Sequence, residues 1–389
     1  MRQVISTERR PIKLWLDDME EGALAQAKNL ANLPFIHKWV AIMPDSHQGY
    51  GMPIGGVSAL YGAISPNMVG VDIGCGMSVI ELPITVEQIT PYLKEIVGEI
   101  REMIPTGFNK HNEPQKEMWM PKIEVKEDWW VIPAQYSNAT HQVGTLGGGN
   151  HFIELQADKE NKVHLMIHSG SRNLGFKVAK YYNDLAKKMN ELWYTSVPKE
   201  HDLAFLPIGT KEAGHYITEM KYCVEFAKCN RDLMTARIVD FLREVFKEEE
   251  FFLSNSINIA HNYATMENHY GKNVWVHRKG ATSAKEGELG IIPGSQGTQS
   301  YIVRGKGNKE SFMSCSHGAG RKMGRKQAKR ELNLEEEQAK LEGILHSVRG
   351  VDDLDEATGA YKDINVVMAN QTDLVSIVKE LRPLAVVKG

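Results

Sequence analysis

Three short glycine-containing segments constrain the fold of this chain most strongly. They are residues 71–76, 147–151 and 314–321, and each places a metal-binding or nucleophilic side chain among glycines. Glycine allows the backbone to approach a ligand closely and to adopt dihedral angles that other residues avoid. Because the segments are far apart in the sequence and rich in Asp, Cys and His, we expect one polar site assembled from distant parts of the chain.

The composition is that of a folded protein with a sizeable core. The chain has 389 residues, of which 42% are hydrophobic, which is enough for one large domain or two ordinary ones. Its formal net charge is -3, so the molecule as a whole does not attract nucleic acid. A nucleic-acid partner would therefore have to bind a local basic patch.

The cysteines and the first residues indicate the cellular compartment. Cys75, Cys223, Cys229 and Cys315 are widely spaced and form no CxxC pair, as in a reduced cytosolic protein. Residues 1–10 are polar and lack the apolar stretch of a signal peptide. Because the chain has no run of about 18 apolar residues, we expect a cytoplasmic protein without a membrane span.

The hydrophobic pattern predicts helices and strands along the whole chain. Helices are expected at residues 17–33, 85–103, 211–248, 321–345 and 372–381. Strands are expected at residues 39–43, 151–155 and 163–168, with strand and turn character at 291–304. Residues 105–133 are expected to form an irregular surface excursion packed by Trp119, Trp129 and Trp130. Because the motifs lie in all parts of this pattern, we expect one mixed α/β (α+β) domain over residues 1–389.

Two of the expected strands, 151–155 and 163–168, are joined by a polar loop. Alternate residues of an extended strand share a face, so Asn150 and Glu154 should lie together, away from His151. A hairpin would bring His151, at the start of one strand, close to His168 at the end of the other.

Five side chains could together bind metal ions. Asp72 and Cys75 form a D-x-x-C pair between glycines, and this carboxylate and thiolate can reach one ion or two adjacent ions. The imidazole candidates are His151, His168 and His261. The set would give mixed O, S and N ligation, which suits Zn, Mn or Fe and does not choose among them. The alternative is a buried structural cysteine, a turn aspartate and hydrogen-bonded structural histidines.

His317 differs from the other histidines because it lies in the string Ser-His-Gly-Ala-Gly-Arg. Imidazole can attack phosphorus and form a covalent intermediate. The flanking glycines, Gly318 and Gly320, would allow backbone N–H groups to face a phosphate. Arg321 is expected to begin a helix whose N-terminal dipole also favours anions. The alternatives are a sixth metal ligand and a structural histidine in a turn.

A basic run follows His317. Residues 321–330 include six basic residues in ten, and on a helix Arg321, Arg325 and Lys329 would share one face. Beside a nucleophile, such a stripe indicates a path for a polyanion. The alternative is a solvated helix whose charge is balanced by the glutamates at 335–337.

The loop at residues 293–300, Pro-Gly-Ser-Gln-Gly-Thr-Gln-Ser, offers hydroxyl groups and backbone donors that could hold a nucleotide base or phosphate. It is not a Walker A motif, because the Gly-Lys-Ser/Thr ending is missing, and no G-x-G-x-x-G opens a Rossmann unit. The alternative is an ordinary turn.

In their order along the chain, these motifs resemble the RtcB family of GTP-dependent RNA ligases. The strings are Asp-x-x-Cys, Gly-Gly-Gly-Asn-His, His-Ser-Gly-Ser-Arg, Ala-His-Asn, Pro-Gly-Ser and His-Gly-Ala-Gly-Arg. The resemblance extends from residues 43–49 to residues 386–389, nearly the whole chain. It implies a single-domain mixed α/β fold with several β-sheets and surrounding helices around a deep cleft that holds two Mn²⁺ ions.

The resemblance also implies roles for individual residues. Cys75 would bridge the two Mn²⁺ ions, and Asp72, His151, His168 and His261 would complete the ligand set. His317 would be the catalytic nucleophile. The residues implied to contact GTP or GMP are Asn150, Glu154, Asn262, Pro293, Gly294, Ser295, Gln296, Ser300, Gly318, Ala319, Gly320, Tyr361 and Lys388. RNA phosphates would contact Arg172, Arg321 and Arg325. Asp45 and His47 would lie near the RNA 5′-hydroxyl or support the metal ligands.

The implied reaction joins RNA ends in tRNA splicing or RNA repair, with GTP as co-substrate. His317 takes GMP from GTP, and a 3′-phosphate, formed where needed from a 2′,3′-cyclic phosphate, takes GMP from His317. The 5′-hydroxyl of a second strand then attacks, and GMP leaves. The sequence does not specify which RNA is joined or whether an activating protein is required, and no feature demands more than a monomer.

Two other classes of protein share part of this pattern. A dinuclear metal phosphodiesterase or cyclic phosphatase would need the same metal ligands but no nucleotide acceptor, so His317 and Lys388 argue against it. A non-catalytic RNA-binding protein would retain the fold without needing His317.

Overall fold

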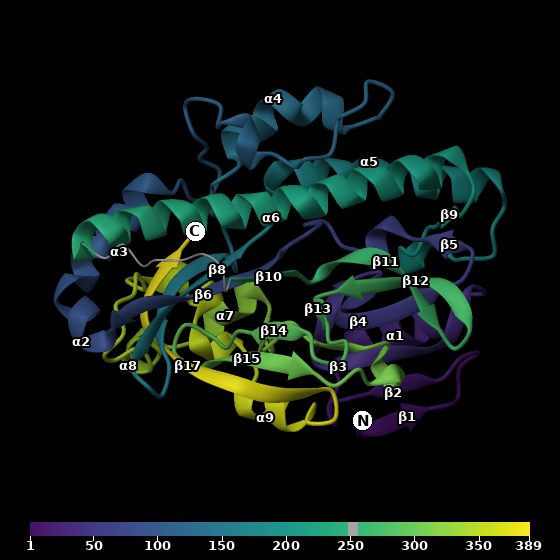
Figure 1. Ribbon diagram of the computed structural model, residues 1–389. Coiled ribbons are helices and arrows are strands. Elements are labelled where there is room, and N and C mark those ends of the chain that lie inside the picture. The colour runs from purple at the N-terminus through teal and green to yellow at the C-terminus, as the bar shows by residue number, and fades with distance from the viewer. Residues whose placement is uncertain (248–255) are drawn as a thin grey trace.

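In the computed structural model, which describes residues 1–247 and 256–389, two large β-sheets form the centre of the fold (Figure 1). One has six described strands, in the order β1 (Gln3–Ile5), β2 (Ile12–Leu14), β3 (Ile36–Tyr50), β4 (Met52–Leu60), β12 (Lys272–Lys279) and β11 (Asn262–His269). The other has seven described strands, in the order β10 (Ile257–Ala260), β6 (Gly76–Thr85), β8 (Lys162–Ser169), β7 (Phe152–Ala157), β17 (Val375–Lys388), β15 (Ser300–Gly305) and β14 (Leu289–Ile292). Neighbouring strands of these sheets are antiparallel, apart from the parallel pair β2 and β3.

Short elements and helices surround the two sheets. The small sheets pair β13 (Ala281–Ser283) with β16 (Ser314–Ser316), and β5 (Ala63–Ile64) with β9 (Leu206–Pro207). The α-helices are α1 (Glu21–Ala31), α2 (Val86–Ile89), α3 (Leu93–Met103), α4 (Ile132–Gln142), α5 (Arg172–Leu192), α6 (Lys211–Phe246), α7 (Arg325–Glu331), α8 (Leu334–Ala339) and α9 (Ile364–Ala369). The 3₁₀ helices are η1 (Pro66–Met68), η2 (Thr90–Tyr92), η3 (Glu117–Trp119), η4 (Lys199–His201), η6 (Lys309–Ser311), η7 (Val351–Glu356) and η8 (Thr358–Ala360). The long helix α6 runs across both sheets, with α5 beside it and α4 above (Figure 1).

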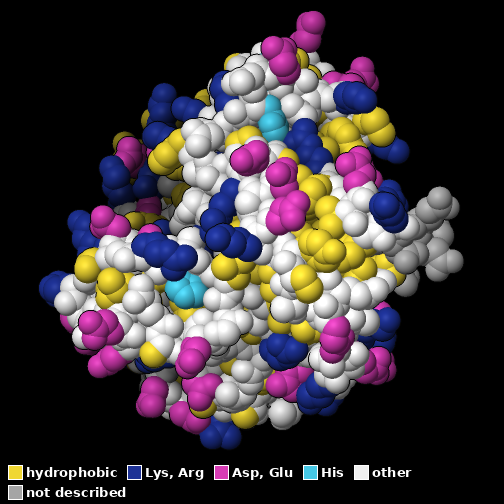
Figure 2. Space-filling model, turned by 90° about the vertical axis from the view of Figure 1, so that its left-hand side faces the viewer, with side chains coloured by type: hydrophobic (Ala, Val, Ile, Leu, Met, Phe, Trp, Pro, Cys, Tyr) yellow, Lys and Arg dark blue, Asp and Glu magenta, His cyan; other side chains and the backbone are white. Residues whose placement is uncertain are grey.

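This architecture confirms the predicted mixed α/β class. Among the described residues, no helix combines the length and the apolar character that crossing a membrane would require. Acidic and basic side chains are interspersed over the face shown in Figure 2, in keeping with the small net charge. Any attraction for a polyanion therefore has to be local.

The predicted excursion at 105–133 is confirmed, since η3 and turns make up its structure before α4 begins. Trp129 is buried in a core cluster that includes residues of α4, α5 and α6, and Trp119 and Trp130 pack against the same cluster. The excursion is thus attached to the helical layer by its tryptophans.

Three predicted helices are recovered with changed limits. Residues 17–33 contain α1, and residues 85–103 contain α2 and α3 separated by η2. The break follows from Pro91, whose ring removes a backbone donor and opposes a continuous helix. Residues 211–248 contain α6, which ends at Phe246, whereas Glu248 lies outside the described residues.

The prediction of a final helix at 372–381 is wrong, because this segment enters strand β17. β17 pairs with β15 through residues 375–381 and with β7 through residues 382–388, so the hydrogen bonds to β15 outweigh any helical preference of this segment. Val375, Ile377 and Val378 are β-branched, which favours a strand. Pro383 lies at a register shift, where a missing N–H is tolerated.

The prediction of one helix over 321–345 is also wrong. The segment forms α7 and α8, with Asn333 between them, and the Asn333 side chain accepts hydrogen bonds from the backbone N–H groups of Glu335 and Glu336. This cap begins a new helix where the pattern suggested continuation. Arg321 precedes α7 and forms a β-bridge with Tyr361, so the expected helical face of Arg321, Arg325 and Lys329 does not exist.

A buried carboxylate connects α6 to the start of α4. Glu219 of α6 is fully buried and accepts hydrogen bonds from the backbone N–H groups of Val131 (2.8 Å) and Ile132 (2.9 Å). Its second oxygen accepts a hydrogen bond from the Tyr182 hydroxyl (2.6 Å). No side chain next to α4 caps its first turn. Glu219, which belongs to the distant helix α6, supplies the acceptor that such a cap would provide.

We predict that Glu219→Ala lowers the free energy of unfolding by about 3 kcal/mol, because it leaves three buried donors without acceptors. Glu219→Gln should lose less, since the amide oxygen can still accept from the α4 backbone. Urea denaturation measures both. The exposed Glu225→Ala on the same helix is the control, and an equal effect of Glu225→Ala would contradict the assignment.

Candidate active site

A cleft of about 730 Å³ contains most of the predicted site residues. Both large sheets contribute to it, with Tyr50 and Lys279 from one sheet and Glu154, His168 and Lys388 from the other. The predicted site residues in its lining are His47, Asp72, Cys75, Asn150, Glu154, His168, His261, Asn262, Pro293, Gly294, Ser295, Gln296, His317, Gly318, Ala319, Gly320, Arg321, Arg325, Tyr361 and Lys388. Asp45, His151, Arg172 and Ser300 lie behind this surface.

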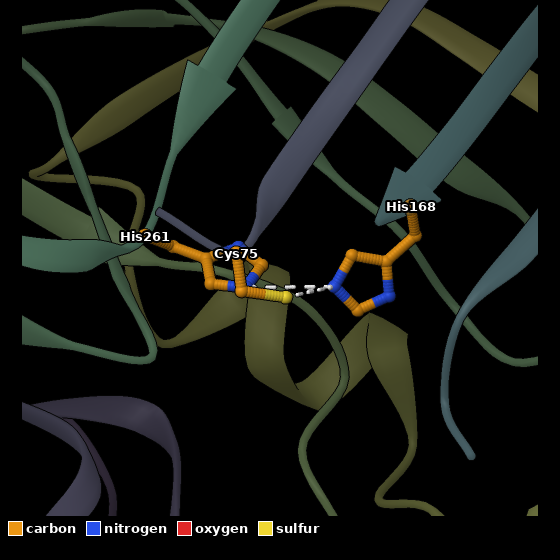
Figure 3. Close-up of side chains that lie close together, drawn as sticks. All are labelled: Cys75, His168 and His261. Carbon is orange, nitrogen blue, oxygen red and sulfur yellow. Dashed lines mark hydrogen bonds between the residues drawn. The ribbon is translucent and has the colours of Figure 1, made fainter. Parts of the chain in front are cut away.

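Cys75, His168 and His261, which all line the cleft, point toward one another (Figure 3). The Cys75 Sγ atom lies 3.4 Å from Nε2 of His168, and the Nε2 atoms of His168 and His261 are 3.4 Å apart. Strand register explains this convergence. Met77 of β6 pairs with His168 of β8, and the backbone N–H of His261 donates to the carbonyl of Cys75 (2.8 Å).

A second group of donors shares the same thiol. His151 Nε2 lies 3.5 Å from Cys75 Sγ and 3.2 Å from Asp72 Oδ2. The expected hairpin of β7 and β8 brings the rings of His151 and His168 to 5.3 Å between centroids. Each triad, Asp72–Cys75–His151 and Cys75–His168–His261, has its donor atoms within 4.8 Å of one another. Cys75 belongs to both, as a ligand bridging two adjacent ions would.

The chemistry of these donors fits bound cations. His168 Nδ1 lies 3.1 Å from the carbonyl oxygen of Asn150, so Nδ1 carries the proton and Nε2 presents its lone pair to the cluster. Burial lowers the pKa of His168 and His261, which keeps both imidazoles in the neutral form that binds metal. Burial, together with the Asp72 carboxylate, raises the pKa of the Cys75 thiol. A cation would displace that proton and compensate the charge.

Two residues of α6 hold the strand ends beneath the cluster. Arg231 is buried and donates to the carbonyls of Gly74 (3.1 Å) and Ser169 (2.8 Å). Asn230 accepts from the backbone N–H of Gly144 (2.7 Å) and donates to the carbonyl of Gly170 (3.1 Å). Sequence reasoning missed both, because nothing in the sequence distinguishes them from the solvated polar residues of the same helix.

His317 lies beside the metal-type cluster, with its ring 4.8 Å from the ring of His261. The fully buried Asp45 holds it. Asp45 Oδ2 is 2.6 Å from His317 Nδ1 and also accepts from the His317 backbone N–H at 3.0 Å. The proton is thereby held on Nδ1, and Nε2 remains for chemistry. Asp45 thus contacts the predicted nucleophile, His317, rather than one of the five expected metal ligands.

His47 lies on the other side of Asp45. Its Nδ1 is 3.1 Å from the Asp45 carbonyl, and burial lowers the pKa of His47 to about 4. The imidazole is therefore neutral near pH 7 and lines the cleft as a hydrogen-bonding group without charge.

Glu356 pairs with the basic residues that line one wall of the cleft. Sequence reasoning did not single out this acidic residue. Its carboxylate lies 3.0 Å from Arg321, 3.1 Å from Arg325 and 3.6 Å from Lys388, and it also accepts from the Tyr361 hydroxyl. Burial by itself would raise the pKa of Glu356, but Lys388 and its other partners lower it. Asp355 also pairs with Arg325 at 3.4 Å, so the cluster carries three cations for two carboxylates and can receive a further negative group.

Glu154 lies deeper on the same wall. Burial raises its pKa to about 7, although Gln156, which donates to it at 2.5 Å, and Lys388 both act in the opposite direction. The Gln156 amide also donates to the Ser300 hydroxyl (3.1 Å), which accepts from the Gly294 N–H (3.2 Å). Ser300 therefore positions the 293–296 loop from behind.

The same loop contacts the segment that carries His317. The carbonyl of Pro293 accepts from the Ala319 N–H (3.0 Å), and the Gln296 amide donates to the Glu356 carbonyl (2.8 Å). Gly320 adopts φ +74, and a Cβ there would lie 2.0 Å from the Asp45 carbonyl oxygen. Glycine is therefore required where this segment passes Asp45.

Two predicted ligand contacts are already engaged within the protein. Arg172 donates to Thr145 (2.9 Å) and to the carbonyl of Gly107 (2.7 Å), away from the cleft surface. The Asn262 amide donates to the Asp72 carbonyl (3.1 Å) and accepts from the Gly280 N–H (2.8 Å). Both side chains hold loops around the cluster in this arrangement.

Comparison with known proteins identifies the family of the chain. A family model described as "tRNA-splicing ligase RtcB" matches residues 26–389. The RNA-splicing ligase RtcB of Escherichia coli K12 is 39% identical, covering 100% of this chain and 99% of its own. The tRNA-splicing ligases RtcB of Thermococcus kodakarensis and Pyrobaculum aerophilum are each 33% identical, covering 98% of this chain and 95% of theirs. The chain therefore belongs to the RtcB family.

Proposed function

We propose that this protein is a GTP-dependent RNA ligase that joins 2′,3′-cyclic phosphate or 3′-phosphate ends to 5′-hydroxyl ends. The observation that carries the proposal is the placement of His317. Asp45 fixes its Nδ1, and its ring contacts His261 of the donor cluster that shares Cys75. The names of the relatives, RNA-splicing and tRNA-splicing ligase, support the same activity.

Two Mn²⁺ ions are the proposed cofactors. Asp72, Cys75 and His151 would hold one ion, and Cys75, His168 and His261 the other. Such ions neutralise the charge of phosphate oxygens during displacement at phosphorus. The protein's own part is to keep the imidazoles of His168 and His261 neutral through burial and to bring the Nε2 atoms of the three histidines together, as the strand register and Asn150 do.

The proposed chemistry begins with His317. Its Nε2 attacks the α-phosphorus of GTP, so that an N–P bond forms, pyrophosphate leaves, and Asp45 stabilises the imidazolium through Nδ1. An oxygen of the RNA 3′-phosphate then displaces His317 and carries GMP. Finally, the 5′-oxygen of the second strand forms a bond to the 3′-phosphate phosphorus as the bond to GMP breaks. The hydroxyl proton passes to water.

The proposed nucleotide subsite is one wall of the cleft, formed by Glu154, the 293–296 loop, Tyr361 and Lys388. A carboxylate can accept from both N1–H and the 2-amino group of guanine, which adenine does not offer together. Glu356 leaves Arg321, Arg325 and Lys388 with an excess of positive charge for phosphates of GTP or RNA.

We further propose that residues 1–389 act as one domain and that the protein works as a cytoplasmic monomer. Residues from 47 to 388 line one cleft, so a division of the chain would separate parts of the same surface. Cleaved tRNA or other RNA ends are the proposed substrates.

The nucleophile is tested by incubating the purified protein with labelled GTP and Mn²⁺ and then denaturing it. Acid-labile, base-stable label is expected on the wild type, because a phosphoramidate has this stability. His317→Ala should retain bound metal, measured by elemental analysis after dialysis, and lose the label. Label on His317→Ala would rule out this nucleophile, and its absence from the wild type would favour a phosphodiesterase. Labelling of the protein alone would show that guanylylation needs no activating protein.

The bridging role of Cys75 is tested by the same two measurements. Cys75→Ala should lose both metal and label, because the thiol belongs to both donor triads. Cys223→Ala is the matched control, since Cys223 is equally buried but lies in the apolar core. Full metal content in Cys75→Ala would contradict the shared thiol.

Guanine recognition by Glu154 predicts a pH dependence of GTP binding. Because the pKa of Glu154 is raised to about 7, the carboxylate that accepts from guanine is lost as the pH falls through 7. GTP affinity, measured by calorimetry, should increase between about pH 6 and pH 8. Glu154→Gln should weaken GTP binding and remove this dependence. An unchanged profile in Glu154→Gln would show that another group titrates.

A further inference from the structure

Tyr50 is an aromatic side chain on the cleft wall that has no partner among the described residues. It is the last residue of β3, before the turn into β4, and is 74% exposed, although it lines the same cleft as His317. Within residues 1–247 and 256–389, its ring has no aromatic contact and its hydroxyl no hydrogen bond. Packing of the protein does not account for an aromatic ring at this position.

The backbone of this turn is nevertheless held from several sides. The Gln26 side chain donates to the Gly49 carbonyl (2.7 Å) and accepts from the Gly49 N–H (3.0 Å). The Nζ atom of the buried Lys279 donates to the Tyr50 carbonyl (2.5 Å). Gly51 has φ +67, and a Cβ there would lie 2.4 Å from the Asp202 carbonyl oxygen. The backbone of Tyr50 is thus held in place, whereas its ring is exposed to solvent.

A fixed aromatic ring in a phosphate-binding cleft is suited to stacking on a nucleobase. Every base offers a π-face, so such a contact tolerates any sequence. Because the turn is already ordered, little conformational entropy is lost when a base binds. Tyr50 therefore has the properties of a stacking platform for single-stranded nucleic acid.

The positions of the lining residues on the two sheets indicate which RNA strand Tyr50 contacts. Glu154 and Lys388, in the proposed nucleotide subsite, belong to the seven-stranded sheet of the described structure, whereas Tyr50 and Lys279 belong to the six-stranded sheet. In an in-line displacement, the attacking and leaving oxygens lie on opposite sides of the phosphorus. When GMP leaves towards the nucleotide subsite, the attacking 5′-hydroxyl approaches from the opposite side of the phosphorus, and Tyr50 offers a ring outside that subsite.

We propose that Tyr50 stacks on the terminal base of the RNA strand that carries the 5′-hydroxyl and thereby positions this strand for attack. This inference rests on the proposed function and adds the subsite of the acceptor strand. Tyr50 acts in the joining step alone, in which the 5′-oxygen–phosphorus bond forms and the phosphorus–oxygen bond to GMP breaks.

The test separates the half-reactions. Tyr50→Ala should raise the KM for a 5′-hydroxyl oligonucleotide about 10-fold, measured with a strand that already carries GMP on its 3′-phosphate. Tyr50→Phe should remain within about two-fold of the wild type, because the ring still stacks. Labelling of His317 and transfer of GMP to an RNA 3′-phosphate should be unchanged in both variants. Tyr61→Ala is the control, since Tyr61 is 56% exposed but does not line the cleft.

A second experiment uses a 5′-hydroxyl acceptor strand that lacks its terminal base. Removing the 5′-terminal base should raise the KM of the wild type as much as Tyr50→Ala does and should have little further effect on that variant. Unchanged joining by Tyr50→Ala, or loss of GMP transfer instead of joining, would overturn the acceptor assignment alone. A wild type that forms no guanylylated His317 would refute the proposed function and this inference with it.

Discussion

The structure of the site depends on the register of strands β6, β8 and β10. Their ends place Cys75, His168 and His261 next to one another, and a slip of one residue would turn each side chain to the other face. Arg231 enforces this register from α6, because its buried guanidinium bonds to carbonyls at Gly74 and Ser169. The long helix is therefore part of the site although it supplies no ligand to it.

Charge in the cleft is arranged in two separate groups. In one group, the imidazoles of three histidines, the Cys75 thiol and the Asp72 carboxylate face one another, and cations would compensate them. In the other group, Glu356 gathers Arg321, Arg325 and Lys388, and an anion would compensate their remaining charge. His317 contacts His261 of the first group and lines the same cleft as the second, so both groups could stabilise a phosphoryl group on its ring.

The sequence predicted those parts of the site that local chemistry determines. Glycines around Cys75 and His317, and the alternation in 151–155 and 163–168, were sufficient to expect the cluster and the hairpin. Residues whose role depends on tertiary packing were missed, since a polar side chain such as Arg231 on a long helix is indistinguishable from a solvated one. The segment 372–381 was misassigned for the same reason, because pairing of its residues 375–381 with β15 decides its conformation.

The order of the larger sheet has a consequence for how the chain acquires its native state. β10, β6 and β8 are neighbours in space but are separated by long stretches of sequence, and β17 joins them from the far end of the chain. Such a topology has a high contact order, so the last pairings form slowly. Ions that bind only the completed cluster would draw the equilibrium towards the folded chain by mass action. Metal supply during synthesis would then govern how much folded protein accumulates, and a metal-starved cell would hold less of it.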